Sequence, residues 1–352
     1  MRLAYAPYIL KFKQPAGTSR GVMTEKPTFL IKVFDEKDPY RFGIGECSVF
    51  PGLSPEADGN YGYKLIELLA NMALGKETDL SRHSSILFGL EQALRDYAGG
   101  CRHIYFPSDF TAGRTSIEIN GLVWMGNFDE MIERIDEKVR KGFHCIKLKI
   151  GAIDWKKEIE MIEYISRKYS DEELQIRVDA NGAFTMENAL PRLKRLADLG
   201  VHSIEQPIPA GIPELMAFLC SVSPLKIALD ESLIGVYGED AKSALLDEIR
   251  PAYVILKPSL CGGFSGAEEW IRLAEDRGIG WWVTSALESN VGLNALAQWT
   301  ATLETSIPQG LGTGALFTNN FVSPLHLDSD RLSYDPETSI GDEIYSSLDW
   351  RY

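Results

Sequence analysis

The sequence predicts an α/β protein in which a parallel sheet closes into a (β/α) barrel, preceded by a smaller α+β domain. From about residue 114, short apolar strands alternate with amphipathic helices, an order typical of parallel sheets. The first hundred residues instead give strands and then helices, as small α+β domains do. Charged side chains recur at the carboxyl ends of the later strands, where the sites of barrel proteins lie.

The composition is ordinary for a globular protein, with 45% hydrophobic and 24% charged residues. The 352 residues suit one large domain, or a large domain with a smaller partner. The net charge of −14 argues against nucleic acid or an anionic membrane as the main partner. The five cysteines form no CxxC pair, and neither a signal peptide nor an apolar run long enough for a membrane span is recognisable. We therefore expect a cytoplasmic protein with reduced thiols.

The first domain is expected over residues 1–112. Residues 29–50 alternate apolar and polar side chains around a polar turn, which predicts antiparallel strands. Residues 62–75 and 84–100 predict two helices that end at glycine. Residues 101–114 form the expected boundary.

The barrel is expected over residues 113–314, with about eight strands. Predicted strands include residues 115–123, 145–150, 174–180, 201–207, 225–232, 251–259 and 279–289. Predicted helices occupy residues 127–142, 154–170, 186–200, 212–222, 238–249, 263–278 and 291–303. In the first of them, Asn127 is the expected N-cap and Gly142 ends the helix. A doubly wound open sheet is the alternative, but no GxGxxG motif follows an early strand.

Six polar residues lie at or near successive strand ends: Lys149, Asp179, Glu205, Asp230, Lys257 and Ser285. Their spacings are 30, 26, 25, 27 and 28 residues, one βα unit each, so we expect them at one mouth of the barrel. Clustered carboxylates repel unless a cation neutralises them, and hard oxygen ligands suit Mg²⁺. Asp179, Glu205 and Asp230 are the predicted Mg²⁺ ligands, with Mn²⁺ as a substitute. Local helix capping is the alternative for each acid taken alone.

The stretch CIKLKI, residues 145–150, places Lys147 and Lys149 on one face of a strand. An ammonium group near a second ammonium and a divalent cation loses proton affinity and can act as a base. Lys149 is the predicted base, and Lys147 is expected to lower its proton affinity or to contact an anion. Lys257 is expected on the opposite side of the carboxylates. A solvated edge strand is the alternative interpretation of an isolated KxK pair.

These motifs resemble the enolase superfamily, in the subgroup of muconate lactonizing enzymes. The matching residues are KxK at Lys147–Lys149, DAN at Asp179–Asn181, EQP at Glu205–Pro207, DES at Asp230–Ser232 and KPS at Lys257–Ser259. The resemblance covers nearly the whole chain. It implies a TIM-like modified (β/α)7β barrel, an α+β capping domain, and a C-terminal segment, residues 315–352, that returns to the capping domain. Enzymes of this superfamily combine a Lys or His base with Mg²⁺.

Residues 256–270, 281–299 and 310–325 resemble the o-succinylbenzoate synthase family. The resemblance implies a carboxylate substrate, a syn dehydration that yields 2-succinylbenzoate, and a place in menaquinone biosynthesis. Lys149 would remove the proton next to the carboxylate and return it to the departing hydroxyl, while Lys257 stays charged. N-succinylamino acid racemase, dipeptide epimerase and muconate cycloisomerase are the alternatives in the same superfamily. A metal-binding or sugar-sensing module is the alternative outside enzymes.

The resemblance also suggests further contacts. Gly262 and Gly263 would present backbone N–H groups to the succinyl carboxylate, or form a plain turn. Ser285 would bind a substrate oxygen or begin a helix. Asn181 would orient Glu205 or the waters on the metal, or it would form a turn. Supporting positions are assigned to Glu231 and Glu288.

Two Gly/Pro-rich loops, residues 14–21 and 50–56, are similar to the loops of the superfamily's capping domain that close over the barrel mouth. Arg20 in the first loop is therefore a candidate substrate contact. The sequence leaves the oligomeric state open and is compatible with a homo-oligomer.

Overall fold

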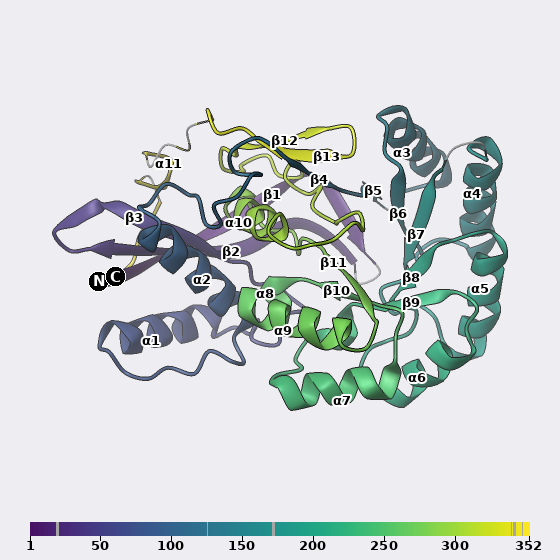
Figure 1. The fold of residues 1–352 in the computed structure, drawn as a ribbon, viewed down its shortest axis with the longest axis horizontal. Coiled ribbons are helices and arrows are strands. Elements are labelled where there is room, and N and C mark those ends of the chain that lie inside the picture. Colours follow the sequence, from purple (N-terminus) through teal and green to yellow (C-terminus); the bar gives the residue numbers. More distant parts are fainter. Residues whose placement is uncertain (19–20, 125, 171–172, 339, 341–342, 347) are drawn as a thin grey trace.

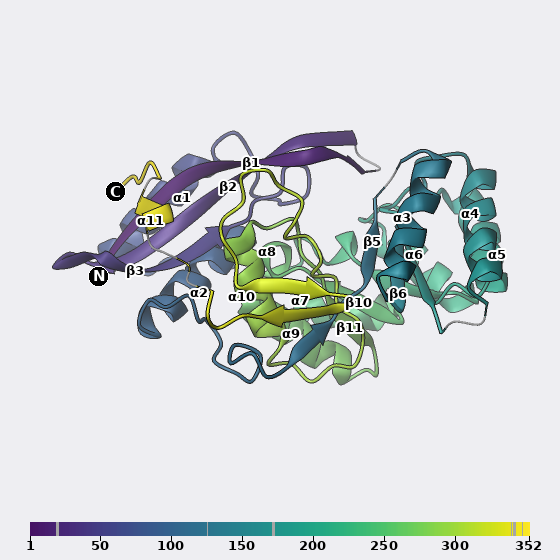
Figure 2. The ribbon, with the colours of Figure 1, turned by 90° about the horizontal axis from the view of Figure 1, so that it is seen from above.

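The computed structural model describes residues 1–18, 21–124, 126–170, 173–338, 340, 343–346 and 348–352. An antiparallel sheet with two helices lies on one side of the molecule, and a parallel sheet with its helices lies on the other (Figures 1 and 2). Among the described residues, every helix is too short or too polar to cross a membrane.

The antiparallel sheet has the order β1-β2-β3, with β1 at Arg2–Thr18, β2 at Gly21–Asp35 and β3 at Asp38–Cys47. The predicted antiparallel pair within residues 29–50 is confirmed as β2 and β3. Residues 14–18 differ from the sequence-based expectation of a loop, because they form the end of β1. Pro15 and Gly17 disfavour a strand locally, but residues 16–18 pair with residues 21–23 across the hairpin.

Two helices accompany this sheet, α1 at Tyr61–Ala73 and α2 at Ser84–Ala98. Helix α2 approaches β3 backbone to backbone: a Cβ atom at Gly45 would lie 1.9 Å from the carbonyl oxygen of Gly89. Leu65 of α1 and Leu90 of α2 are buried with Ile31 and Val33 of β2 in one apolar cluster. The helices and sheet thus share a core.

The strands of the parallel sheet lie side by side in the same order as in the chain. Its seven strands are β5 (Gly121–Val123), β6 (Cys145–Lys149), β7 (Gln175–Asp179), β8 (Ser203–Glu205), β9 (Lys226–Leu229), β10 (Tyr253–Leu256) and β11 (Gly280–Val283). Parallel bridges Thr284↔Gly310 and Ile119↔Gln309 join the two edges of the sheet. Residues 309 and 310 therefore complete the barrel that the alternating pattern predicts.

Helices lie between and after these strands. They are α3 (Phe128–Arg140), α4 (Trp155–Lys168), α5 (Met186–Asp198), α6 (Pro213–Val222), α7 (Glu239–Ile249), α8 (Pro258–Cys261), α9 (Gly263–Glu275) and α10 (Asn290–Thr300), with a 3₁₀ turn at Glu231–Leu233. Helices α3 to α7 cover the outside of the curved sheet (Figure 1). The predicted cap of α3 is confirmed, because the Asn127 side chain accepts from the N–H of Glu130 in a capping box.

The predicted strand at residues 115–123 is instead divided into β4 (Ser116–Glu118) and β5. Strand β4 pairs with β13 (Arg331–Tyr334), which pairs with β12 (Leu325–Asp328) in a second antiparallel sheet. Between β4 and β5, the N–H of Asn120 donates to Gln309 O at 2.9 Å. The two halves thus have different partners, which an apolar pattern in the sequence does not reveal.

The C-terminal part of the chain contacts the first antiparallel sheet. Phe317 bridges Phe12 and Arg351 bridges Tyr5, and the short helix α11 spans Glu343–Ser346. The two termini consequently lie close together (Figures 1 and 2). The domain boundaries after residues 112 and 314 stay predictions.

Candidate active site

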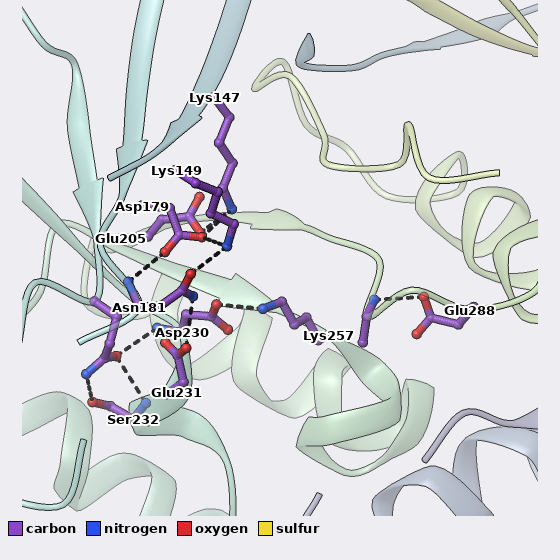
Figure 3. Close-up of polar contacts among 12 residues, drawn as sticks. Lys147, Lys149, Asp179, Asn181, Glu205, Asp230, Glu231, Ser232, Lys257 and Glu288 are labelled. Carbon is purple, nitrogen blue, oxygen red and sulfur yellow. Dashed lines mark hydrogen bonds and ion pairs between the residues drawn. The ribbon is translucent and has the colours of Figure 1, made fainter. Parts of the chain in front are cut away.

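Three lysines and three carboxylates from the sequence motifs lie together at the carboxyl end of the barrel (Figure 3). Lys147 and Lys149 are on β6, and Asp179 and Glu205 are the last residues of β7 and β8. Asp230 directly follows β9, and Lys257 directly follows β10. Because neighbouring parallel strands end at the same mouth, a regular sequence spacing becomes a cluster in space.

The carboxylates form a buried triad. One oxygen from each of Asp179, Glu205 and Asp230 lies within 4.8 Å of the others, and all three residues are buried. Among the described residues, Glu205 Oε1 has no hydrogen-bond partner, which is costly for a buried polar atom. Three converging hard oxygen donors with an unsatisfied lone pair fit a divalent cation such as Mg²⁺.

The lysines reach the triad from two sides. Lys149 Nζ lies 2.5 Å from Asp179 Oδ2 and 2.8 Å from Asn181 Oδ1. Lys147 Nζ lies 3.0 Å from the same Asp179 oxygen and also pairs with Glu205. From the other side, Lys257 Nζ lies 2.6 Å from Asp230 Oδ2. Figure 3 shows Lys257 pointing toward Asp230, whereas Lys147 and Lys149 point toward Asp179 and Glu205.

Burial and charge act against each other in this cluster. Burial alone would raise the pKa of Asp179, but Lys147, Lys149 and Lys257 hold it well below its usual value. Burial raises the pKa of Glu205, as do the charges of Asp179 and Asp230, although Lys147 opposes the shift. Burial would lower the pKa of Lys147, but the three carboxylates raise it. Lys147 is thus held as an ammonium group.

Asn181 links the triad to Glu231. Its N–H donates to Asp179 Oδ1 at 3.0 Å, and its Nδ2 donates to Glu231 Oε1 at 3.0 Å. Its φ of 44° lies in the left-handed region, which asparagine tolerates better than most residues. The predicted turn is therefore present, and the side chain contacts Lys149 and Glu231.

Gln206 is a positioning residue that the sequence interpretation missed. Its Oε1 accepts from the N–H groups of Asp230 and Ser232 at 3.2 and 3.1 Å. Its Nε2 donates to Ser232 Oγ at 2.9 Å. Gln206 thereby fixes the end of the next strand, where Asp230 stands. Its place beside Glu205 in the EQP motif was the available signal.

Ser285 lines the cavity at the barrel mouth. Its hydroxyl already makes hydrogen bonds to other residues of the protein. Ser285 Oγ donates to Glu288 Oε2 at 2.6 Å and accepts from Thr313 Oγ1 at 2.8 Å. Glu288 also accepts from Ser259 Oγ at 2.8 Å. Burial raises the pKa of Glu288, and the charge of Lys26 opposes that shift. Ser285 Oγ also accepts from Leu287 N at 3.1 Å, so its donor hydrogen and both acceptor lone pairs are engaged within the protein.

Gly262 and Gly263 stand at the start of α9, with φ values of 101° and 70°. The next two N–H groups, of Phe264 and Ser265, donate to the Glu91 carboxylate of α2 at 2.6 and 3.1 Å. Neither glycine is among the described residues that line the cavity beside Lys149 and Lys257. Their proposed contact with a substrate carboxylate stays a prediction.

A cavity of about 290 Å³ opens above the cationic groups. Its charged and polar lining includes Lys147, Lys149, Lys257, Asn181 and Ser285. Its apolar lining comes from both parts of the chain: Met23, Phe50 and Leu53 come from the N-terminal part, and Leu122, Trp124 and Leu287 come from the barrel part. Such a cavity suits a small anionic ligand with an apolar body. Arg20 lies outside the described residues.

Comparison with known proteins places this geometry in context. Residues 130–332 match the family described as enolase C-terminal domain-like. The chain is 47% identical to the o-succinylbenzoate synthase of Desulfotalea psychrophila, over 94% of this chain and 98% of that protein. A crystal structure of MenC from the same organism superposes with a TM-score of 0.84 and 42% identity, over 95% of this chain and 99% of that one.

A more distant structure shares the fold alone. The L-Ala-D/L-Glu epimerase of Bacillus subtilis superposes with a TM-score of 0.80 at 19% identity, over 97% of this chain and 98% of that one.

Proposed function

Since the chain belongs to the enolase superfamily and, within it, to the o-succinylbenzoate synthase family, we propose that it is a metal-dependent carbon–oxygen lyase. The reaction is the syn dehydration of 2-succinyl-6-hydroxy-2,4-cyclohexadiene-1-carboxylate to 2-succinylbenzoate, a step of menaquinone biosynthesis. The observation that carries the proposal is the carboxylate triad with Lys149 and Lys257 on opposite sides of it.

Asp179, Glu205 and Asp230 are proposed to hold Mg²⁺, with Mn²⁺ as a substitute. The unsatisfied oxygen of Glu205 and the convergence of three buried carboxylates support this assignment. When bound there, the cation would supply positive charge to the substrate carboxylate as the neighbouring proton leaves.

Lys149 is proposed as the general base. The proton next to the substrate carboxylate is weakly acidic, so its removal needs a base within hydrogen-bond reach. Lys149 lines the cavity and is held in place by Asp179 and Asn181. The C–H electron pair forms the new ring double bond, and the hydroxyl leaves. The protonated Lys149, on the same face, donates to that hydroxyl, so that the products are water and an aromatic ring.

Lys257 is proposed to remain an ammonium group on the opposite face of the substrate. Burial would lower the pKa of Lys257, but Asp230 and Glu231 raise it, which favours a lasting positive charge. A cation facing the ring stabilises the negative charge that develops on proton removal, through charge and through the ring's π electrons. Lys147, also held charged, is proposed to contact the substrate carboxylate.

Racemisation or epimerisation of an N-succinylamino acid is the second candidate. It would need both lysines as proton carriers, and both line the cavity. Muconate cycloisomerase activity is a weaker alternative with the same motifs. The 47% identity to an o-succinylbenzoate synthase over nearly the whole chain favours dehydration.

We also propose a cytoplasmic location, which the five free, scattered cysteines support. The reaction requires one small-molecule partner, the carboxylate substrate.

The test is ultraviolet absorbance after purified protein is mixed with the cyclohexadiene substrate, with Mg²⁺ or with EDTA. The expected result is rapid loss of the diene band that EDTA prevents and Mg²⁺ restores. Folded, metal-loaded protein that leaves the band unchanged would contradict dehydration. Deuterium exchange on N-succinylamino acids in ²H₂O would then test the second candidate.

A further inference from the structure

A second buried polar cluster lies where the first antiparallel sheet meets the barrel, outside the carboxylate triad. It contains Lys26 and Thr28 of β2, Glu46 of β3, and Ser48, Glu288 and Ser289, all of them buried. One ammonium group thus lies among two carboxylates. Charges this deep are rare in proteins unless they are paired or hydrogen-bonded, so the arrangement calls for a role.

Glu46 connects the first antiparallel sheet to helix α10 through hydrogen bonds. Its carboxylate accepts from Ser289 N and Oγ at 2.9 and 2.5 Å, and from Gly292 N at 2.9 Å. It therefore takes up N–H groups at the start of α10, where a negative charge is favourable. Thr28 Oγ1 donates to the same carboxylate at 2.8 Å. Glu46 joins two strands of the sheet to the segment that follows Glu288.

Lys26 is 1% exposed, and its ammonium donates to Ser48 Oγ at 2.8 Å. It also lies 6.0 Å from the centre of the Phe50 ring. Burial lowers the pKa of Lys26, while the charges of Glu46 and Glu288 oppose that shift. An ammonium in this place balances the carboxylates on both sides of the boundary, one from the sheet and one from the barrel.

Lys26 is connected to both the strand end and the loop that line the cavity. Along β2, Lys26 follows Gly21, Val22 and Met23, which line the cavity. Ser48, its hydrogen-bond partner, lies two residues before the second loop, where residues 50–53 line the cavity. On the barrel side, Glu288 binds the hydroxyl of Ser285, another lining residue. Lys26 is thus connected to three parts of the cavity wall, through its own strand, through Ser48 and through the charge of Glu288.

We propose that Lys26 is a positioning residue that holds the loop at residues 50–53 and the strand end at residues 21–23 over the cavity, against Glu288 of the barrel. It touches neither the triad nor the reacting atoms, and acts through Ser48, Phe50 and Glu288. Its effect on turnover rests on the proposed dehydration, whereas its effect on the loops does not.

The test compares Lys26→Met with Lys32→Met. Lys32 is a matched control, because it is also a buried lysine of β2 but lies over the rings of Phe34, Phe42 and Trp350, away from the cavity. Backbone hydrogen exchange, followed by mass spectrometry on the full chain without ligand, reports loop placement. Steady-state dehydration with Mg²⁺ reports its consequence for the substrate.

We expect Lys26→Met to speed exchange at residues 48–54 and 21–24 and to leave α4 and α5 unchanged. We expect KM to rise about tenfold with kcat within about threefold, since substrate binding, and not the chemical step, loses support. Lys32→Met should change neither the exchange rates at residues 48–54 and 21–24 nor the KM. Unchanged loop exchange in Lys26→Met, equal acceleration throughout the chain, or the same pattern in Lys32→Met would each overturn the proposal.

If Lys26→Met does not fold, Ser48→Ala tests the same proposal. The Ser48→Ala substitution removes one hydrogen bond of Lys26 and keeps its ammonium group. Faster exchange confined to residues 48–54 supports the proposal, and no change overturns it. Wild-type protein without dehydratase activity would contradict the proposed reaction, but the exchange measurements would still test the placement of the loops.

Discussion

Lys147 and Lys149 both direct their ammonium groups to a single carboxylate oxygen, Asp179 Oδ2, at 3.0 and 2.5 Å. The repulsion expected between two neighbouring lysines on one strand face is thus offset by a shared anion. The other contacts of the two lysines differ, because Lys147 also pairs with Glu205 whereas Lys149 contacts Asn181. This difference suggests separate roles for two residues of the same chemistry.

Lys149→Ala should lower kcat by about 10²–10⁴-fold, the usual contribution of a general base. The triad remains, so Mg²⁺ should still bind. The measurement is the rate of diene loss under saturating Mg²⁺, with metal binding followed by calorimetry. Lys156→Ala, on the exposed side of α4, is the control and should keep the wild-type rate. A fully active Lys149→Ala would exclude Lys149 as the base.

The activity should depend on the positive charge of the side chain at position 257, and not on its ability to exchange a proton. Lys257→Met should reduce kcat by about 10²–10³-fold, as the loss of one stabilising group in an active site commonly does. Lys257→Arg should lose less, because arginine keeps the positive charge. At position 149, arginine should be as inactive as alanine, since a guanidinium group does not give up its proton in proteins. Equal losses for arginine at both positions would instead indicate two proton carriers.

Mg²⁺ should raise the melting temperature of the wild-type protein, because a ligand that binds only the folded state stabilises it. At a hundredfold excess over Kd the gain is about 2.7 kcal/mol. Glu205→Gln should largely abolish this response. Glu269→Gln is the matched control, because Glu269 also pairs with a lysine, Lys242, but outside the triad. The assignment fails if Glu205→Gln shows the wild-type Mg²⁺-dependent shift in calorimetry.

Gly45→Ala should destabilise the first antiparallel sheet and α2. The added Cβ would lie 1.9 Å from Gly89 O, so the helix must move away from the strand. We expect a loss of about 1–3 kcal/mol or more in the free energy of unfolding, measured by urea denaturation. Gly59→Ala, whose Cβ would meet no atom within 4 Å, should change it by less than about 0.5 kcal/mol. Similar stability of the two variants would disprove the close packing.

The sequence predicts the barrel and its mouth well because both depend on periodic features. Strand–helix alternation marks β6 to β11, and one polar residue per unit marks Lys149, Asp179, Glu205, Asp230 and Lys257. Contacts between distant segments leave no such period. The division of residues 115–123 depends on pairing with β13, and the closure of the barrel depends on residues 309 and 310.

The second polar cluster was missed for the same reason. Lys26 and Glu46 look like ordinary polar residues of alternating strands, and only the packing of the sheet against Ser289 and Glu288 buries them. Gln206 had a local signal, since it adjoins Glu205, but its partners Asp230 and Ser232 belong to the next βα unit. Pairings of this kind require the tertiary structure.

His202 should make the protein less stable in mild acid. Burial, with the charges of Arg177 and Lys226, lowers the pKa of His202 from 6.5 to about 4. Between these values the unfolded chain binds a proton that the folded protein does not. Stability is therefore full above pH 6.5 and falls as the pH drops toward 4. Because the ring is only partly buried, we expect a contribution of about 1–3 kcal/mol.

The measurement is the free energy of unfolding at several pH values, for the wild type and for His202→Asn. The asparagine variant should show a shallower decline between pH 6.5 and 4, since other groups titrate equally in both proteins. His144→Asn gives the opposite sign, because a hydrogen bond to Asp330 raises the pKa of His144. Its stabilising effect is present in acid and is lost as the pH rises, so removing it should steepen the acid decline. Parallel pH profiles for the wild type and His202→Asn would show that His202 is protonated equally in the folded and unfolded states.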